Sequence, residues 1–198
     1  MIKNDMEYKV IDNFLDEKYF ESLSLFFSNR ELRDTSDETE LLPWFFQHTI
    51  VGENEYYGDN SKLFYMTHLF YDKNVPRSEY FHKLIPLLEK LNVRCLIRAK
   101  GNLYPNTEKI HEHSMHTDYP FSHSAAVLSL NTCDGYTKLG DGTKINSVAN
   151  RILLFDASEE HCSTTTTNVL ARFNINLNYI QEQFHDEIEY NSRNILYK

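Results

Sequence analysis

The chain has 198 residues, of which 41% are apolar and 25% charged, enough for one globular domain with a sizeable core. Its net charge of −9 disfavours a protein that covers nucleic acid through broad phosphate contacts, although it allows a local basic patch. No apolar run approaches the length of a membrane span, and the first residues lack the apolar core of a secretory signal, so we expect neither.

The three cysteines, Cys95, Cys133 and Cys162, are an odd number without close spacing. They predict reduced thiols and an intracellular, cytoplasmic protein. With only 6 glycines and 5 prolines, the chain shows no long flexible linker, so we expect a single domain over residues 1–198. Residues 1–92 would then support a β-sheet core over residues 93–180, and residues 181–198 would form a polar tail.

Helix and strand patterns alternate in the first half of the chain without obvious chemistry. The expected elements are a short strand over residues 7–11, a helix from Asp12 or Asp16 to about Asn29, strands over residues 47–51 and 63–71, and a helix over residues 78–91 that Pro86 kinks or breaks. His68, alone in one of these strands, is expected to be a satisfied core or edge residue.

Two aromatic groups in this half are assigned to the core. The first predicted helix repeats apolar side chains at helical spacing, namely Phe14, Leu15, Phe20, Leu23, Phe26 and Phe27. A dense aromatic run follows at residues 42–46, where a wall of the core is favoured over a pocket rim.

The second half is expected to be mainly β. Strands are predicted over residues 93–99, 124–131, 151–155 and 172–179, with glycine-containing hairpin and turn sequence over residues 133–147. The last strand alternates apolar residues with Arg172, Asn174, Asn176 and Asn178. This polar face favours a barrel interior over a solvated surface, which would carry more Lys, Glu and Thr. Inside a barrel, Arg172 can hold a carboxylate through two parallel charge-assisted hydrogen bonds.

The candidate metal ligands are His116 and Asp118, which stand two residues apart just before a predicted strand. On a strand, residues i and i+2 share a face about 7 Å apart, so both side chains can lean toward one ion. His161, in the loop expected after the strand over residues 151–155, is the best third ligand. Two histidines and a carboxylate form the facial triad of non-haem Fe(II) oxygenases.

Alternatives to these ligands stay open. His111 and His113 have the same spacing and are a rival pair, although the carboxylate favours His116 and Asp118 because it supplies negative charge for Fe(II). His161, taken by itself, is equally well explained as a surface loop residue.

The run over residues 100–105 also has two interpretations. If it is extended, Asn102 and Tyr104 share a face, and a bound organic acid would satisfy these polar groups inside a barrel. The same run also suits a turn, because Asn, Gly and Pro all favour one.

Together these residues resemble the Fe(II)- and 2-oxoglutarate-dependent oxygenases of the prolyl 4-hydroxylase-like group. The resemblance covers roughly residues 93–179 and rests on an ordered set of motifs: Tyr104-Pro105, His116-x-Asp118 with Pro120, Leu130-Asn131, Gly135-Tyr136-Thr137, the run over residues 150–155, His161, and Arg172 eleven residues later. It implies an α+β, mainly β fold, a double-stranded β-helix (a jelly-roll, cupin-like barrel) with supporting N-terminal helices.

The resemblance also implies roles for these residues. His116, Asp118 and His161 would bind Fe(II), and Arg172 would bind the distal carboxylate of 2-oxoglutarate. Tyr104 resembles the tyrosine that hydrogen-bonds this co-substrate. The Asn102-x-Tyr104 and Arg172-x-Asn174 pairs are similar to those that contact 2-oxoglutarate in the alkylation-repair branch. The implied reaction uses O2 to hydroxylate an unactivated C–H bond and converts 2-oxoglutarate to succinate and CO2, with ascorbate as an optional reductant.

Two positions depart from the family pattern. Asn178 stands where the alkylation-repair branch has a second arginine, which argues against nucleobase repair, as does the net charge of −9. Residues 135–139 replace the usual Gly-Gly-x-Leu turn, and we expect this turn to lie away from the metal.

The substrate is assigned from the resemblance alone. A peptide, modified by a prolyl-type peptidyl hydroxylase, is the first expectation, and Tyr119, Phe121 and His123 near the iron would suit it. The alternatives are a small-molecule hydroxylase and, from another class, a non-catalytic metal-binding jelly roll. A phage protein acting in the host cytoplasm is compatible with this resemblance, and the sequence sets no oligomeric state.

Overall fold

The structure is a computed structural model, and it describes residues 7–29, 41–48 and 64–181. Its strands are β1 (Tyr8–Ile11), β2 (Phe45–Gln47), β3 (Tyr65–Asp72), β4 (Val75–Pro76), β5 (Cys95–Pro105), β6 (Ser124–Ser129), β7 (Tyr136–Leu139), β8 (Lys144–Asn146), β9 (Arg151–Asp156), β10 (His161–Ser163) and β11 (Ala171–Ile180). Its helices are α1 (Glu17–Ser28), the 3-10 helix η4 (Glu79–Leu84) and α2 (Ile85–Lys90).

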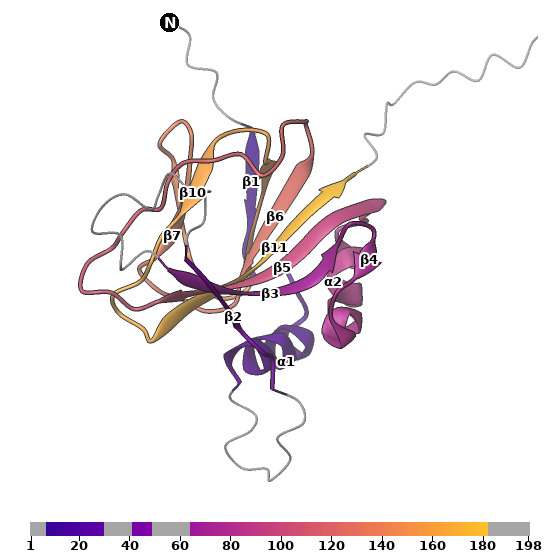
Figure 1. Ribbon diagram of the computed structural model, residues 1–198, viewed down its shortest axis with the longest axis horizontal. Helices are drawn as coiled ribbons and strands as arrows, with labels where there is room; N and C mark the ends of the chain where they lie inside the picture. The colour runs from indigo at the N-terminus through magenta and orange to yellow at the C-terminus, as the bar shows by residue number, and fades with distance from the viewer. Residues whose placement is uncertain (1–6, 30–40, 49–63, 182–198) are drawn as a thin grey trace, which may run out of the picture.

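Two antiparallel sheets form the framework (Figure 1). The large sheet runs β1-β9-β6-β11-β5-β3-β2, with β4 paired to β3, and the small sheet runs β10-β7-β8. This is the expected mainly β, jelly-roll arrangement, but the barrel is not closed, because no strand of the described chain belongs to both sheets. The N-terminal region that was expected to support the core also contributes β1 to β4 to the large sheet.

The large sheet is the middle layer of the molecule, because its strands alternate between two apolar clusters. On one side the sheet packs with α1, η4 and α2, through buried residues that include Leu23, Phe27, Leu87, Leu128 and Leu177. On the other side, β6 and β9 pack with β7, through buried residues that include Val127, Leu139 and Phe155. Fully burying a Leu or Phe side chain stabilises a fold by about 1.5–3 kcal/mol.

Helix α1 confirms the predicted N-cap and apolar stripe. Asp16 Oδ1 accepts hydrogen bonds from the backbone amides of Lys18 and Tyr19, and Asn29 ends the helix in the left-handed conformation at φ 53°. The Cβ that glycine lacks at Gly101 of β5 would lie 2.7 Å from Cε1 of Phe27, so the helix approaches the sheet closely there.

The second helical region is broken as predicted. A 3-10 helix, capped by the Ser78 side chain, passes directly into α2, and Pro86 lies in the first turn of α2. No helix in the described ranges is long and apolar enough to cross a membrane. All three cysteines are free thiols, with Cys95 exposed and the other two buried.

Two local predictions need correction. In the aromatic run, Leu42 is buried and Trp44 packs against the core, but Phe45 and Phe46 are 58% and 52% exposed, so the core assignment is wrong for these two. The strand predicted over residues 47–51 is β2, displaced toward Phe45, and residues 49–51 lie outside the described ranges, as does most of the predicted tail.

Strand β5 settles the two interpretations of residues 100–105. It continues to Pro105, paired on one side with β11 and on the other with β3, so Asn102 and Tyr104 lie on an extended segment and the turn is wrong. The predicted strand was too short because Gly101, Asn102 and Pro105 lower local β propensity, whereas pairing on both sides overrides it.

Candidate metal centre

His116, Asp118 and His161 come together at one point of the structure. Each offers one ligand atom, and these three atoms lie within 4.8 Å of one another. His161 Nε2 is 3.8 Å from Asp118 Oδ2, and the two imidazole centroids are 4.6 Å apart. Two imidazole nitrogens and one carboxylate oxygen at this spacing could hold a transition-metal ion. The rival histidines His111 and His113 do not belong to this group.

Backbone hydrogen bonds, and not the predicted strand, bring the three candidate ligands together. His116 and Asp118 do not lie on a strand, so that prediction is wrong. Instead, His116 and His161 form one antiparallel bridge, in which each backbone amide donates to the other residue's carbonyl at 3.0 and 2.9 Å. His161 begins β10 and is therefore not in a loop. The Asp118 amide donates to the Ala157 carbonyl at 3.0 Å, which fixes the second ligand relative to the third.

Both imidazoles are oriented by backbone carbonyls. His161 Nδ1 is 3.1 Å from the Glu159 carbonyl oxygen, and His116 Nδ1 is 3.2 Å from that of Ser114. A carbonyl only accepts, so each Nδ1 carries a proton, and in the neutral form of the ring this leaves the Nε2 lone pair for a metal. Burial and the neighbouring His116 lower the pKa of His161, which keeps this ring neutral at physiological pH.

Two residues that sequence reasoning missed hold the Asp118 carboxylate. Arg98 Nη2 donates to Oδ1 at 2.7 Å, and Asn178 Nδ2 donates to Oδ2 at 2.8 Å. Burial alone would raise the pKa of Asp118, but Arg98 and Asn178 hold it well below its usual range, so the group stays ionised. Asn178 is also 3.2 Å from Nε2 of His123, whose Nδ1 donates to the Phe121 carbonyl and leaves Nε2 as the acceptor.

A polar ladder extends from the metal group across the large sheet. We use this name for four cross-strand pairs of β5 and β11: Arg98 with Asn178, Lys100 with Asn176, Asn102 with Asn174, and Tyr104 with Arg172. Asn102 and Asn174 are each 2% exposed and share a hydrogen bond of 2.8 Å. The prediction of a polar interior face on the last strand is therefore confirmed, and β5 supplies a matching face.

Arg172 is buried at the end of the ladder distant from Asp118. Its Nη1 donates to the Thr164 carbonyl at 3.3 Å and its Nη2 to Thr137 Oγ1 at 3.1 Å, while its guanidinium carbon lies 5.4 Å from the Tyr104 ring centroid. A Cβ at Gly135 would come within 2.8 Å of Arg172 Cδ, so a side chain there would displace the arginine. Burial lowers the pKa of Arg172 and raises that of Tyr104.

The segment over residues 135–139 is consequently not remote from the site, and that prediction is wrong. Thr137 accepts from Arg172 and lines the cavity between the ladder and the metal group. Its position follows from the pairing of β7 with β10, which places Thr137 opposite Ser163, two residues from His161.

The cavity is polar and narrow. It measures about 30 Å³, space for only one or two water molecules, so a dicarboxylate requires lining side chains to move. Several buried polar atoms have no hydrogen-bond partner among the described residues. Asn102 Oδ1 and Asn176 Oδ1 belong to residues that line the cavity, whereas Arg172 Nε and Asn178 Oδ1 belong to ladder residues outside its lining. Buried polar groups are normally paired, so this set is suited to a polar ligand. An unpaired guanidinium N–H fits an anion, and the donor set of the triad fits a divalent metal.

No family model matches the sequence, and no curated protein is recognisably similar to it. Solved structures do match. A prolyl 4-hydroxylase from Pseudomonas putida is 14% identical, with 89% of this chain and 94% of that chain covered and a TM-score of 0.57. A 2OG-Fe(II) oxygenase family oxidoreductase from Burkholderia pseudomallei is 12% identical, with coverages of 88% and 85% and a TM-score of 0.60.

A third similar structure is a prolyl hydroxylase from Trichoplax adhaerens in complex with a peptide fragment of the hypoxia inducible factor oxygen degradation domain. It is 14% identical, with coverages of 89% and 84% and a TM-score of 0.58. At these identities the likeness shows the fold, which is that of the 2OG-Fe(II) oxygenases. The jelly-roll fold implied by the sequence resemblance is therefore confirmed.

Proposed function

We propose that this protein is an Fe(II)- and 2-oxoglutarate-dependent dioxygenase that hydroxylates an unactivated C–H bond, with a peptide as substrate. The observation that carries the proposal is the His116, Asp118 and His161 group at one end of a buried polar ladder, with Arg172 at the other end. Structures with this fold include 2-oxoglutarate oxygenases, which supports an oxidoreductase.

The metal would be held by the Nε2 atoms of both histidines and by the Asp118 carboxylate. Both rings hold Nδ1 against a backbone carbonyl and direct Nε2 to the metal, and Arg98 and Asn178 keep the carboxylate ionised and oriented. Two neutral nitrogens and one anionic oxygen on one side suit Fe(II) and leave other positions open. When bound, Fe(II) and 2-oxoglutarate supply the activation of O2, with succinate and CO2 as co-products.

The co-substrate would be anchored by Arg172, Tyr104, Asn102 and Asn174. Arg172 would neutralise the distal carboxylate of 2-oxoglutarate, because its Nε has no partner in the described part of the chain and its side chain is buried. A charge pair in such a low-dielectric site is stronger than in water. Thr137 and the Thr164 carbonyl accept hydrogen bonds from the guanidinium and so fix its orientation.

A peptide is proposed as the substrate because an open groove of about 670 Å³ adjoins the narrow metal cavity. A prolyl hydroxylase with the same fold has been solved with a peptide bound, which supports this choice by analogy. An acidic protein of net charge −9 is poorly suited to nucleic acid.

The test is succinate release in the presence of Fe(II), 2-oxoglutarate and ascorbate. We expect turnover by the wild type, none by His116→Ala, and unchanged turnover by His111→Ala, which removes a nearby imidazole outside the ligand group. Turnover by His116→Ala at the wild-type rate would show that the ligand assignment is wrong. Metal binding without any 2-oxoglutarate consumption would instead indicate a binding module.

A further inference from the structure

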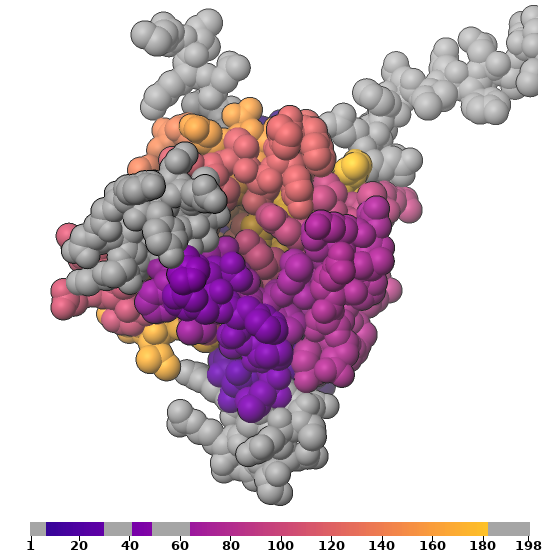
Figure 2. Space-filling model, viewed as in Figure 1, coloured from indigo at the N-terminus to yellow at the C-terminus, as the bar shows by residue number. Residues whose placement is uncertain are grey.

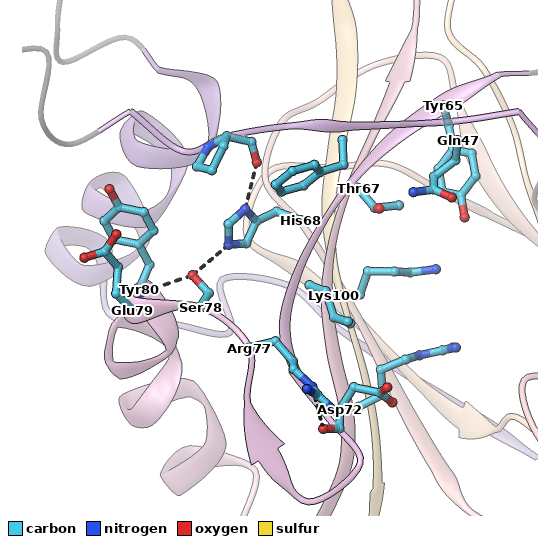
Figure 3. A pocket seen from close by; sticks show the side chains of 14 residues that line it. Gln47, Tyr65, Thr67, His68, Asp72, Arg77, Ser78, Glu79, Tyr80 and Lys100 are labelled. Carbon is cyan, nitrogen blue, oxygen red and sulfur yellow. Dashed lines mark hydrogen bonds between the residues drawn. The ribbon is translucent and has the colours of Figure 1, made fainter.

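The groove next to the metal centre is formed by the open side of β3 and by β5 (Figure 3). Two of its lining residues, Tyr65 and Lys100, also line the metal cavity, so they form the boundary between the two spaces. Figure 2 shows the surface hollowed beside the magenta segment that contains residues 72–90. A substrate that extends from this groove into the metal cavity would therefore contact the boundary formed by Tyr65 and Lys100.

The walls of the groove suit an extended chain. Strand β3 pairs with β2 at residues 65–67 and with β4 at residues 71–72, and the Phe70 carbonyl accepts from the Arg77 amide at 2.8 Å, so within the described chain only the edge around residues 68–69 has no backbone partner on that side. Phe45, 58% exposed, lines the groove from β2. His68 is held rigidly, 2.7 Å from both the Pro43 carbonyl oxygen and Ser78 Oγ. Peptides commonly bind in an extended form along a fixed sheet edge of this kind, next to an exposed aromatic ring.

The charged residues that line the groove are Asp72, Glu79, Arg77, Arg98 and Lys100, and among them only Lys100 also lines the metal cavity. Arg98 is paired with Asp118, and Arg77 Nε donates to the Asp72 carbonyl at 3.2 Å. The Lys100 ammonium makes no hydrogen bond or ion pair with any described residue, and its closest recorded interaction is with the Tyr65 ring, 5.6 Å from the centroid. Burial and the nearby Arg98 lower the pKa of Lys100 to about 8, so it is still mainly protonated at neutral pH. A half-buried cation without an acceptor is unfavourable unless a ligand supplies one.

On the ladder, Lys100 lies between the Arg98 rung beside Asp118 and the Tyr104 rung beside Arg172. Lys100 and Tyr104 are two rungs apart on the ladder, which places their Cα atoms about 13 Å apart along β5. The distal carboxylate of 2-oxoglutarate is assigned to Arg172 at the Tyr104 rung, and its other end to the metal. Unlike the residues assigned to the co-substrate, Lys100 also lines the groove, so a substrate in the groove can reach it.

We propose that the groove binds a peptide that carries an Asp or Glu side chain close to the hydroxylated residue, and that Lys100 receives this carboxylate. The inference rests on the proposed function and extends it to the substrate. Lys100 would thus act as a specificity-determining residue, because it selects the side chain that enters the boundary between groove and metal cavity.

The experiment uses positional libraries of heptapeptides with acetylated and amidated ends, so that only side chains carry charge. The protein is supplied with Fe(II), 2-oxoglutarate and ascorbate, and addition of one oxygen atom is detected by mass spectrometry. We expect Glu or Asp to be enriched over Gln or Asn at one position near the hydroxylated residue. Lys100→Met should reduce this preference by roughly tenfold or more, the effect of losing one buried charged hydrogen bond. Lys100→Glu should favour Lys or Arg at the same position.

Lys18→Met is the matched control, because it removes an equal charge from the exposed first turn of α1 and should leave the preference unchanged. In each variant, the visible band formed by Fe(II) and 2-oxoglutarate without O2 reports on the proposed function separately. A missing band in the wild type contradicts that function and this inference with it. A band accompanied by equal use of Glu and Gln, or by a preference that survives Lys100→Met, contradicts only the inference. A band without any hydroxylated peptide contradicts the inference and also the peptide substrate of the proposed function.

Discussion

On β11, Ile175 and Leu177 belong to the core shared with α1, whereas Asn174 and Asn178 face the metal cavity, yet all four side chains are at most 2% exposed. Burial of the aliphatic pair stabilises the fold directly, by about 1.5–3 kcal/mol for each side chain. Burial of the polar face does not, because an unpaired amide or guanidinium atom costs about 1–3 kcal/mol. The aliphatic face of β11 therefore holds the sheet together, whereas its polar face is available to a ligand.

His161→Ala should separate the roles of the two faces most strongly. It should abolish Fe(II) binding and all 2-oxoglutarate turnover, because the group of three ligand atoms loses one imidazole. The fold should persist, since this ring contacts an apolar cluster at Phe155, with centroids 4.9 Å apart, and is not itself a member of either cluster. Metal binding is measured by equilibrium dialysis and folding by circular dichroism. Retention of tight Fe(II) binding by a folded variant would exclude His161 as a ligand.

Leu177→Ala should instead weaken the fold and leave 2-oxoglutarate use unchanged. Truncation of a side chain that is 1% exposed should lower the free energy of unfolding by about 2–5 kcal/mol, because it leaves a cavity against the helical layer. At a temperature where the variant is folded, its 2-oxoglutarate requirement should match that of the wild type. Denaturant unfolding and a co-substrate titration check the two expectations. A large change in the co-substrate requirement would mean that the two faces are not independent.

Arg172→Met should raise the 2-oxoglutarate concentration needed for half-saturation by roughly 100-fold, because a buried charge pair is lost. Fe(II) should still bind, since Arg172 lies at the far end of the ladder from Asp118. The free energy of unfolding should fall little or rise, because the variant no longer buries a guanidinium with an unpaired Nε. Equal co-substrate affinity in both proteins would refute the assignment.

Arg98→Met tests the residue that holds the metal carboxylate. Loss of its 2.7 Å hydrogen bond should weaken Fe(II) binding by about 10- to 100-fold, as is usual for partners that orient a metal ligand. Dialysis against graded Fe(II) provides the measurement, and Arg77→Met, an arginine with no contact to Asp118, is the comparison. Unchanged Fe(II) affinity would show that the hydrogen bond from Arg98 does not support metal binding by Asp118.

The smallest effect concerns a surface group. Glu112 lies beside Lys138 and Lys144 at 2.6 and 3.1 Å, and hydrogen bonds from Lys138 and Tyr136 lower its pKa to about 2. A carboxylate with a lowered pKa in the folded state adds stability above its ordinary pKa of 4.5 and loses it as the pH falls toward 2. Glu112→Gln should therefore be slightly less stable than wild type at pH 6 and equal to it near pH 2. A stability difference that does not change with pH would contradict this.

The sequence could predict what depends on residues close together in the chain. The alternation of β11 predicted its polar face, and the spacing of His116 and Asp118 predicted two ligands. The hydrogen bonds that hold the Asp118 carboxylate could not be predicted. Their donors, Arg98 and Asn178, are far apart in the chain, and only the pairing of β5 with β11 places them opposite each other. The same holds for Thr137, whose place beside Arg172 depends on the small sheet.

The central claim is that the His116, Asp118 and His161 group and the polar ladder together bind Fe(II) and 2-oxoglutarate. The most direct measurement is the visible absorption of the Fe(II)-loaded protein, without O2, as 2-oxoglutarate is added. A charge-transfer band should appear and saturate in the wild type, should be absent from His161→Ala, and should require far more co-substrate in Arg172→Met. Absence of any band in the wild type, with Fe(II) shown to be bound, would contradict the claim.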